Sequence, residues 1–203
     1  MKIFCIGMNY LNHVAELNNK VPEKPVFFMK PETALVKPGM PFFYPDFSKE
    51  IHHEVELVLR IKKLGKNISE KFASTYYHEI GIGIDFTARD LQRECKQKGL
   101  PWEMAKAFDG SGPVSAFVPI ESLENPDSIV FCLKKNGVIV QEGKSTDMIF
   151  GFDRLVSHLS GFSTLKIGDL IFTGTPEGVG PVEIGDHLEC FLENKKMLDI
   201  KVK

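Results

Sequence analysis

The chain has 203 residues, 43% of them hydrophobic, which suits a single domain with a sizeable core. Its 25 basic and 27 acidic residues are interspersed and give a formal net charge of −2, so no broad field would attract nucleic acid or an anionic membrane. The apolar runs fall far short of the roughly 20 residues of a membrane span, and polar residues follow Met8 too soon for a signal peptide. We therefore expect one cytoplasmic domain over residues 1–203.

Four cysteines, Cys5, Cys95, Cys132 and Cys190, lie far apart in the sequence. Because no C-x-x-C pair is present, they suggest neither a zinc ribbon nor a disulfide framework. We expect them to be buried packing residues.

The first 50 residues are predicted to contain one strand and one short helix. An apolar run at 2–7 is typical of a strand, and residues 10–17 favour a helix that ends before Pro22. Six prolines lie between residues 22 and 45, so extended segments and turns are expected there. A long irregular stretch in a compact domain is usually functional.

The clearest strand is predicted at residues 51–61, where side chains alternate between two faces. This alternation places Glu54 and Glu56 on the same face of the strand. A second, short apolar strand is predicted at residues 81–86, and Asp85 lies at its end.

Two helices are predicted around these strands. Ser69 has the side chain of an N-cap for a helix that extends to about residue 79. Thr87 and Asp90 have the spacing of a capping box, which opens a second helix that Gly99 can terminate.

The C-terminal half has mostly β patterns. Predicted strands at 129–133 and 138–140 flank Asn136-Gly137, a dipeptide that favours a type I′ hairpin turn because both central residues need positive φ. The fold class is therefore predicted as α+β and rich in β-structure, with a few peripheral helices and no alternating βαβ series. The remaining elements are a helix at 152–159, two similar turn-and-strand units at 167–171 and 184–188, and a last strand after 194–195.

Glu54 and Glu56 are candidate metal ligands. Two residues along a strand span about 6.5–7 Å, so the two carboxylates repel each other unless a cation lies between them. Asp85 could supply a third carboxylate, and an octahedral Mg²⁺ with three such ligands keeps positions for water or substrate. The alternative is that both glutamates form the solvated outer face of an edge strand.

His13 and Glu16 are a candidate base and its orienting carboxylate. They lie three residues apart on a short predicted helix and so share one face. The alternative is an ordinary surface pair on an exposed helix.

Residues 173–181 form a glycine-rich loop after an apolar strand, where backbone N–H groups and threonine hydroxyls could hold a carboxylate. The loop matches neither a P-loop nor a dinucleotide fingerprint, and the chain has no G-x-S-x-G elbow of a serine hydrolase. The alternative is a purely structural turn.

Together these segments resemble the fumarylacetoacetate hydrolase family over nearly the whole chain. Residues 92–118 most resemble the small single-domain acylpyruvases of that family, some of which also decarboxylate oxaloacetate. The residues that carry the resemblance are 7–10 (GMNY) with His13 and Glu16, 28–31 (FMKP), 53–57 (HEVEL), 85–90 (DFTARD) with Gln92, 106–109 (KAFD) and 173–181 (TGTPEGVGP).

The resemblance implies the family's mixed β-sandwich roll, usually as a dimer or larger assembly, with a single catalytic domain. It also implies Mg²⁺, for which Mn²⁺ or Ca²⁺ could substitute. One departure is Met8, where many relatives have Arg; the difference removes one possible anion contact and bears on substrate preference. The implied roles are metal ligation by Glu54, Glu56 and Asp85, water activation by His13 and Glu16, enolate stabilisation by Lys106, and substrate binding by Arg89, Gln92, Thr175 and Lys30.

The function implied by the resemblance is Mg²⁺-dependent hydrolysis of a C–C bond in acylpyruvates, giving pyruvate and a carboxylic acid, with oxaloacetate decarboxylation as a related activity. One alternative is isomerisation or hydration–dehydration of an unsaturated or sugar-derived 2-oxo acid. Another is a metal-stabilised binding protein without turnover. His13, Glu16 and Lys106 argue against this last alternative, because a structural carboxylate cage needs none of them.

Overall fold

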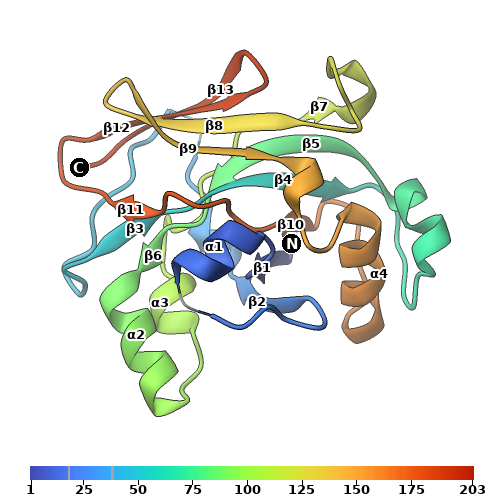
Figure 1. The fold of residues 1–203 in the computed structure, drawn as a ribbon, viewed down its shortest axis with the longest axis horizontal. Helices are drawn as coiled ribbons and strands as arrows, with labels where there is room; N and C mark the ends of the chain where they lie inside the picture. Colours follow the sequence, from blue (N-terminus) through green and yellow to red (C-terminus); the bar gives the residue numbers. More distant parts are fainter. Residues whose placement is uncertain (18, 38) are drawn as a thin grey trace.

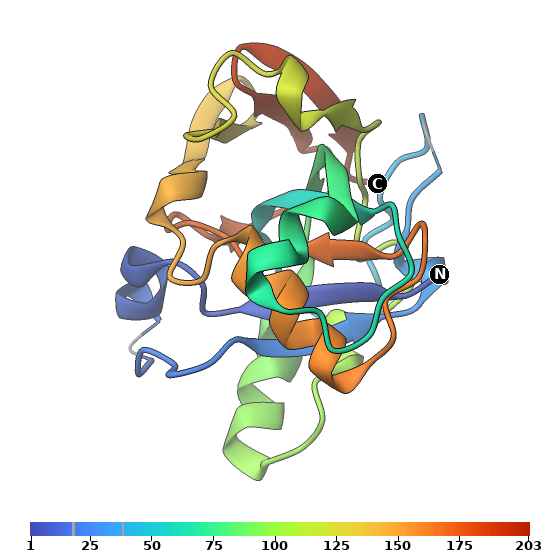
Figure 2. The same cartoon turned by 90° about the vertical axis from the view of Figure 1, so that its right-hand side faces the viewer.

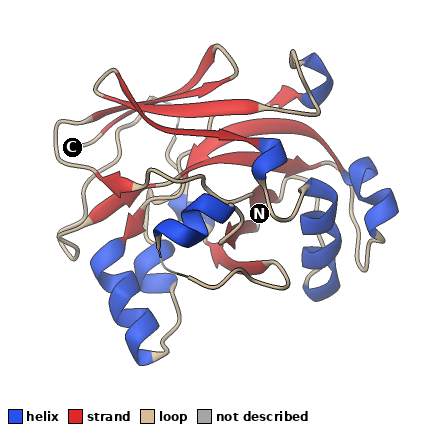
Figure 3. Ribbon diagram, viewed as in Figure 1, coloured by secondary structure: helices blue, strands red, loops and turns tan. Residues whose placement is uncertain are grey.

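The computed structural model describes residues 1–17, 19–37 and 39–203. Two β-sheets form its layers, a smaller sheet lies at one end, and helices cover the margins (Figures 1 and 3). In the view turned by 90°, the four-stranded sheet again lies above the large sheet, and α2 (Arg89–Lys98) projects on the opposite side (Figure 2). The β-rich α+β class predicted from the sequence is therefore confirmed.

The large sheet has six strands in the order β2-β1-β10-β4-β5-β7. Strands β1 and β10 are parallel, and the other neighbours are antiparallel. Nearly all residues of β4 are buried, as expected for a central strand with both faces covered. The bounds are β1 Ile3–Gly7, β2 Val26–Lys30, β4 Val55–Ile61, β5 Tyr77–Ile84, β7 Val118–Pro119 and β10 Leu170–Phe172.

The other two sheets are antiparallel. The four-stranded sheet has the order β13-β12-β8-β9, and the three-stranded sheet has the order β11-β3-β6. The turn between β8 and β9 has positive φ at Asn136 (52°) and Gly137 (82°), so the predicted hairpin is confirmed. The bounds are β3 Ile51–His53, β6 Thr87–Ala88, β8 Val130–Lys135, β9 Val138–Lys144, β11 Gly180–Pro181, β12 His187–Leu192 and β13 Lys195–Lys201.

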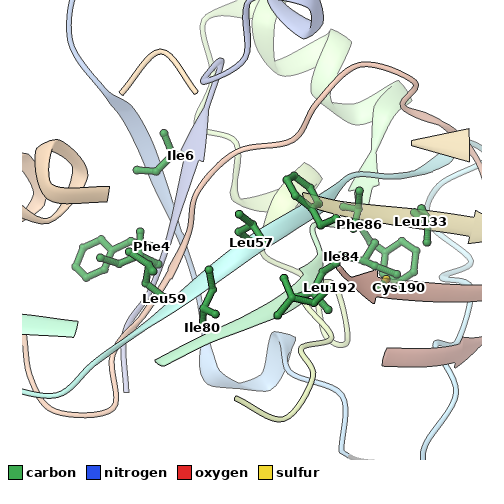
Figure 4. Packing of buried hydrophobic residues seen from close by; sticks show 14 of the residues in the cluster. Phe4, Ile6, Leu57, Leu59, Ile80, Ile84, Phe86, Leu133, Cys190 and Leu192 are labelled. Carbon is green, nitrogen blue, oxygen red and sulfur yellow. The ribbon is translucent and has the colours of Figure 1, made fainter. Parts of the chain in front are cut away.

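The core lies between the large sheet and the four-stranded sheet. Along β12 buried and partly exposed side chains alternate, because only one face of that sheet is covered. Ile84 and Phe86 belong to the same buried cluster as Leu133, Cys190 and Leu192 of the opposite sheet (Figure 4). This packing fixes the end of β5, where Asp85 lies.

The helices lie around the sheets and are short. Across the described residues, every helix is too short or too polar to traverse a lipid bilayer. The predicted helices at 10–17 and 152–159 are confirmed as α1 and α4. The bounds are α1 Leu11–Glu16, α3 Glu103–Lys106 and α4 Phe152–Phe162, with short 3₁₀ helices η1 Glu32–Ala34, η2 Glu70–Tyr76, η3 Ile120–Ser122 and η4 Ser145–Asp147.

The predicted strand at 51–61 is interrupted at Glu54. Residues before the break, β3, pair with β11 and β6, whereas residues after it, β4, pair with β10 and β5. The prediction of one continuous strand was therefore wrong, because the two halves pair in different sheets. Glu54 lies at the point where the chain passes from one sheet to the other.

Two helix predictions need correction. The segment after Ser69 is a 3₁₀ helix without a side-chain cap, and residues 77–79 belong to β5 instead. Thr87 and Asp90 form no capping box, because Ala88 is the N-cap of α2 and Thr87 lies in β6. The carboxylate of Asp90 instead accepts hydrogen bonds from the Ser48 hydroxyl and the Lys49 N–H. The helix does end at Gly99, whose φ of 65° is left-handed.

The remaining predictions mostly hold. The proline-rich stretch includes a regular strand, β2, which pairs with β1, and one of its prolines, Pro38, lies outside the described residues. Cys5, Cys95 and Cys190 are buried as expected, whereas Cys132 is only partly buried.

Candidate metal and substrate site

Three carboxylates meet where β4 and β5 lie side by side. Glu54 occupies the break before β4, Glu56 lies on β4, and Asp85 directly follows β5, with its N–H donating to the Glu54 carbonyl (2.8 Å). Each residue offers an oxygen within 4.8 Å of the others, and all three are at most 5% exposed. The alternative of a solvated outer face is therefore wrong for both glutamates.

Lys106 joins two of these carboxylates. Its Nζ lies 2.8 Å from Glu54 Oε2, 2.8 Å from Asp85 Oδ2 and 2.5 Å from the Thr87 hydroxyl. Burial lowers the pKa of Lys106, but the neighbouring Asp85 and Glu54 charges outweigh it and raise that pKa. These neighbours therefore favour the charged form of the buried amine.

Two further cations surround the cluster. Arg89, the first residue of α2, donates to Glu54 Oε1 (2.5 Å) and to Gln92 Oε1 (2.6 Å). Lys30, at the end of β2, lies 2.8 Å from Asp85 Oδ1, although this contact lacks hydrogen-bond geometry. Its Nζ also donates to the Ser111 hydroxyl (2.9 Å) and to the Lys106 carbonyl. Lys30 thus lies behind the cluster and ties β2 to α3.

Glu56 differs from Glu54 in its electrostatic surroundings. Burial raises the pKa of the Glu56 carboxyl, and the nearby charges of Asp85 and Glu54 raise it further. The hydrogen bond that it accepts from the Gly174 N–H (2.7 Å) lowers this pKa, but does not offset the rise. Burial also disfavours the charged form of Glu54, but Lys106 and Arg89 outweigh it and hold that pKa below its usual value. A divalent cation would relieve the repulsion at Glu56, so the oxygen donors present fit a hard metal ion.

A second group of possible metal ligands lies on the four-stranded sheet. His187, Glu189 and Asp199 also approach one another closely, but their side chains are 20–45% exposed. The Lys196 ammonium already contacts Glu189 (2.9 Å) and Asp199 (3.0 Å). The buried cluster of Glu54, Glu56 and Asp85 is therefore the better candidate for a metal.

We expect Mg²⁺ to raise the melting temperature more at pH 8 than at pH 6. The raised pKa of Glu56 stabilises the metal-free fold at low pH, and this contribution is lost as pH rises through that pKa. Metal binding needs the ionised form, so its stabilising effect grows over the same window. Calorimetry with and without Mg²⁺ at both pH values measures this, with Glu189→Gln as a control that should behave like wild type. Equal shifts at the two pH values would contradict the interpretation.

On α1, His13 lines the same cavity as the three carboxylates, and Glu16 contacts the His13 ring. His13 is 5% exposed, and its Nδ1 lies 3.2 Å from Glu16 Oε2. The other oxygen of Glu16 accepts the Gly178 N–H (3.1 Å), so the pair is attached to the glycine-rich loop. His13 therefore does not belong to an ordinary surface pair.

The side chain of Asn9 fixes the start of α1. Its amide donates to the Thr173 carbonyl (2.8 Å) and the Phe150 carbonyl (3.0 Å), and its Oδ1 accepts the Phe150 N–H (2.8 Å). Met8, the residue before it, has a φ of 59°, which is rare outside glycine and often found near functional sites. The backbone thereby turns from β1 into α1.

The glycine-rich loop contacts several parts of the site. Gly174 has a φ of 101°, and a Cβ there would lie 2.7 Å from Asn9 Cβ, so glycine permits the close approach. The N–H of Gly174 donates to Glu56, and Thr175 lines the pocket. The loop is thus more than a connecting turn.

The structure brings the predicted site residues together around one small cavity of about 30 Å³. Glu16 and Lys30 lie just outside it and contact residues of the site. Lys96 also lines it, and its spacing of four from Gln92 on a helix could have indicated this. Eight of the predicted residues line the cavity, His13, Glu54, Glu56, Asp85, Arg89, Gln92, Lys106 and Thr175, together with Met8, Leu17, Asn19, Phe28, Lys96 and Trp102 among others.

The sequence of this chain is similar to those of several named proteins. The mouse protein named oxaloacetate tautomerase FAHD1, mitochondrial, is 45% identical over 201 residues, which cover 99% of this chain and 91% of the mouse protein. Oxaloacetate tautomerase YcgM of Escherichia coli (strain K12) is 42% identical over 188 residues, covering 92% of this chain and 86% of that protein.

This chain also matches a solved structure and a family model. The crystal structure of fumarylpyruvate hydrolase from Pseudomonas aeruginosa, in complex with Mn²⁺ and pyruvate, matches with a TM-score of 0.93 and 35% identity, covering 100% of this chain and 89% of that one. The family model described as fumarylacetoacetate (FAA) hydrolase C-terminal matches residues 2–203. The chain therefore belongs to the fumarylacetoacetate hydrolase family.

Proposed function

We propose that this chain is a single-domain, Mg²⁺-dependent enzyme that forms the enolate of a small 2-oxo acid, with keto–enol tautomerisation of oxaloacetate as its main reaction. The observation that supports this most is that His13, which Glu16 contacts, and the buried Lys106 cation line the same pocket as three carboxylates. Relatives at 42% and 45% identity carry the name oxaloacetate tautomerase.

Glu54, Glu56 and Asp85 would hold the metal. When bound, the ion would act as a Lewis acid on the carboxylate and 2-oxo oxygens of the substrate. We propose Mg²⁺, with Mn²⁺ or Ca²⁺ as substitutes, because all three prefer oxygen ligands. The Pseudomonas aeruginosa neighbour was crystallised with Mn²⁺ and pyruvate, which supports a divalent ion at such a site.

His13 would move the proton. Glu16 faces Nδ1 of the ring, so Nε2 is left to take a proton from C3 of the substrate. The electron pair of that C–H bond forms the C2–C3 double bond, and negative charge develops on the 2-oxo oxygen. Lys106 would stabilise this charge, and protonation of the oxygen by the His13 imidazolium gives the enol. The reverse sequence converts enol to ketone.

Arg89, Gln92 and Thr175 would fix the substrate oxygens. All three line the cavity, and Gln92 already shares a hydrogen bond with Arg89 (2.6 Å). Lys30 lies outside the cavity lining, so we propose that it holds Asp85 and the Lys106 backbone in place instead of touching the substrate.

Hydrolysis of acylpyruvates to pyruvate and a carboxylic acid is the second candidate, because the same site could expel a pyruvate enolate after His13 activates water. The fumarylpyruvate hydrolase neighbour supports it. Oxaloacetate decarboxylation yields the same enolate without the water. The names of the relatives at 42% and 45% identity favour oxaloacetate over an acylpyruvate as the main substrate.

The proposed function is tested with oxaloacetate enol, acetylpyruvate and fumarylpyruvate, each with and without Mg²⁺. Loss of enol absorbance reports tautomerisation, and pyruvate release reports cleavage or decarboxylation. We expect Mg²⁺-dependent catalysis that is fastest for the enol. If the protein accelerates none of these reactions over buffer, the chain is a binding protein and the proposal is wrong.

We also propose a cytoplasmic location, because all four cysteines are free thiols, as is usual in reducing compartments. The mouse relative is named as mitochondrial, so fractionation of cells that make this protein decides between the two.

We predict a homodimer. Phe43 and Phe47 are 63% and 54% exposed and follow the exposed Met40 closely in the sequence. Large exposed apolar side chains in one segment are typical of an interface. Light scattering at micromolar concentration should give twice the 22.8 kDa chain mass. A Phe43→Asp variant should shift the mass toward the monomer, and a wild-type monomer mass would contradict the prediction.

A further inference from the structure

Gln141 on β9 connects the two chain segments that build the site. Its side chain is 2% exposed. The oxygen Oε1 accepts the Val55 N–H (3.0 Å) and lies 2.9 Å from His53 Nδ1, next to the break that carries Glu54. The nitrogen Nε2 donates to Thr175 Oγ1 (2.9 Å) and to the Pro176 carbonyl (3.1 Å) in the glycine-rich loop.

The two backbone partners determine which way this amide faces. A backbone N–H can only donate a hydrogen bond, and a backbone carbonyl can only accept one. Oε1 must therefore face Val55, and Nε2 must face Pro176, so the usual ambiguity of an amide side chain is removed. Because Nε2 is a donor, the Thr175 oxygen must be the acceptor in the bond between them.

This bond decides what the Thr175 hydroxyl can do. A threonine hydroxyl has one proton to donate. Since Oγ1 accepts from Gln141, that proton must be directed elsewhere, and Thr175 donates to no other group within residues 1–17, 19–37 and 39–203. The side chain is 3% exposed and lines the cavity. An anionic ligand oxygen in the cavity is the partner that fits this proton.

We propose that Gln141 is a positioning residue, which holds the Thr175 hydroxyl as a hydrogen-bond donor to a carboxylate or oxo oxygen of the bound 2-oxo acid. This inference rests on the proposed function only for the nature of the ligand. Gln141 itself does not contact the substrate, because both ends of its amide already bind protein partners.

The variant Gln141→Glu replaces the donor end of the amide, Nε2, by an acceptor oxygen and leaves the acceptor end, Oε1, unchanged. A carboxylate at this position can still accept from Val55 and His53, but it can donate neither to the Thr175 hydroxyl nor to the Pro176 carbonyl. The hydroxyl would then donate to the carboxylate and present its oxygen lone pairs to the ligand. Pyruvate affinity of the Mg²⁺-loaded protein should fall about 10- to 100-fold, the loss typical of a hydrogen bond to a charged group, whereas kcat should change less than KM.

A double-mutant cycle tests whether Gln141 acts through Thr175. Pyruvate affinity is measured by calorimetry for wild type, Gln141→Glu, Thr175→Val and the double variant. We expect Thr175→Val alone to lower pyruvate affinity about as much as Gln141→Glu does. In the double variant, adding the second substitution should lower that affinity by less than about 3-fold more. Thr175→Ser, which keeps the hydroxyl, is the matched control and should bind pyruvate like wild type.

Two outcomes would overturn this assignment. Additive losses in the cycle would mean that Gln141 affects binding independently of Thr175, and unchanged pyruvate affinity in Gln141→Glu would mean that the hydroxyl polarity is irrelevant. If Gln141→Glu does not fold, Gln141→Met removes the same donor and carries the same expectation of non-additivity. A wild-type protein that neither binds pyruvate nor converts any 2-oxo acid would instead overturn the proposed function and this assignment together.

Discussion

Replacing Glu56 by Gln is expected to lower Mg²⁺-dependent activity by about 10³-fold or more while the fold stays intact. Lewis-acid stabilisation contributes several kcal/mol to such reactions, and each 1.36 kcal/mol is tenfold in rate. The change also removes a buried carboxyl whose pKa is raised by burial and by two neighbouring acids. The metal-free variant should therefore melt no lower than wild type at pH 8.

Two measurements check this expectation. Calorimetric titration should show Mg²⁺ affinity lost in Glu56→Gln, and the metal-dependent rise in melting temperature should disappear with it. Glu189→Gln, in the exposed cluster on the four-stranded sheet, is the matched control and should retain both. Wild-type Mg²⁺ affinity in Glu56→Gln would exclude Glu56 as a ligand.

The variant His13→Gln should lower kcat for tautomerisation and for acylpyruvate hydrolysis by about 10²–10⁴-fold, the usual contribution of a positioned general base. Oxaloacetate decarboxylation should be much less affected, because the departing CO₂ leaves its electron pair behind and no base is needed. We expect Glu16→Gln to lower kcat less than His13→Gln does, because the Glu16 carboxylate only orients the His13 ring.

For each variant, the kcat of tautomerisation should be divided by the kcat of decarboxylation, both measured at saturating Mg²⁺. Lys106→Met is the contrasting case and should slow all three reactions, because each passes through the enolate of a 2-oxo acid. If His13→Gln slows decarboxylation as much as tautomerisation, His13 orients the substrate or closes α1 over it, and the proton-transfer role is wrong.

Much of the site could be predicted from the sequence because its parts have local signatures. The two-residue period of a strand placed Glu54 and Glu56 together, and the structure has both carboxylates beside Asp85. Local spacing also predicted His13 next to Glu16. The roles of these residues as ligands and base remain predictions until the variants are measured.

Other features could not be predicted, because they depend on contacts between distant parts of the chain. The break at Glu54 arises because β3 and β4 pair in different sheets, which no local pattern reveals. Gln141 lies in an ordinary strand sequence, and its partners His53, Val55 and Thr175 are 88, 86 and 34 residues away. Thr87 has a capping-box spacing, yet Lys106 uses its hydroxyl instead.

The measurement that tests enolate formation most directly is hydrogen exchange at the methyl group of pyruvate in D₂O, followed by NMR. Every reaction considered for this site passes through an enolate, so the Mg²⁺-loaded wild-type protein should exchange the methyl hydrogens well above the buffer rate. Glu56→Gln and His13→Gln should abolish or strongly slow this exchange. If pyruvate binds to the Mg²⁺-loaded wild-type protein but its methyl hydrogens exchange no faster than in buffer, the site does not form an enolate and the central claim is wrong.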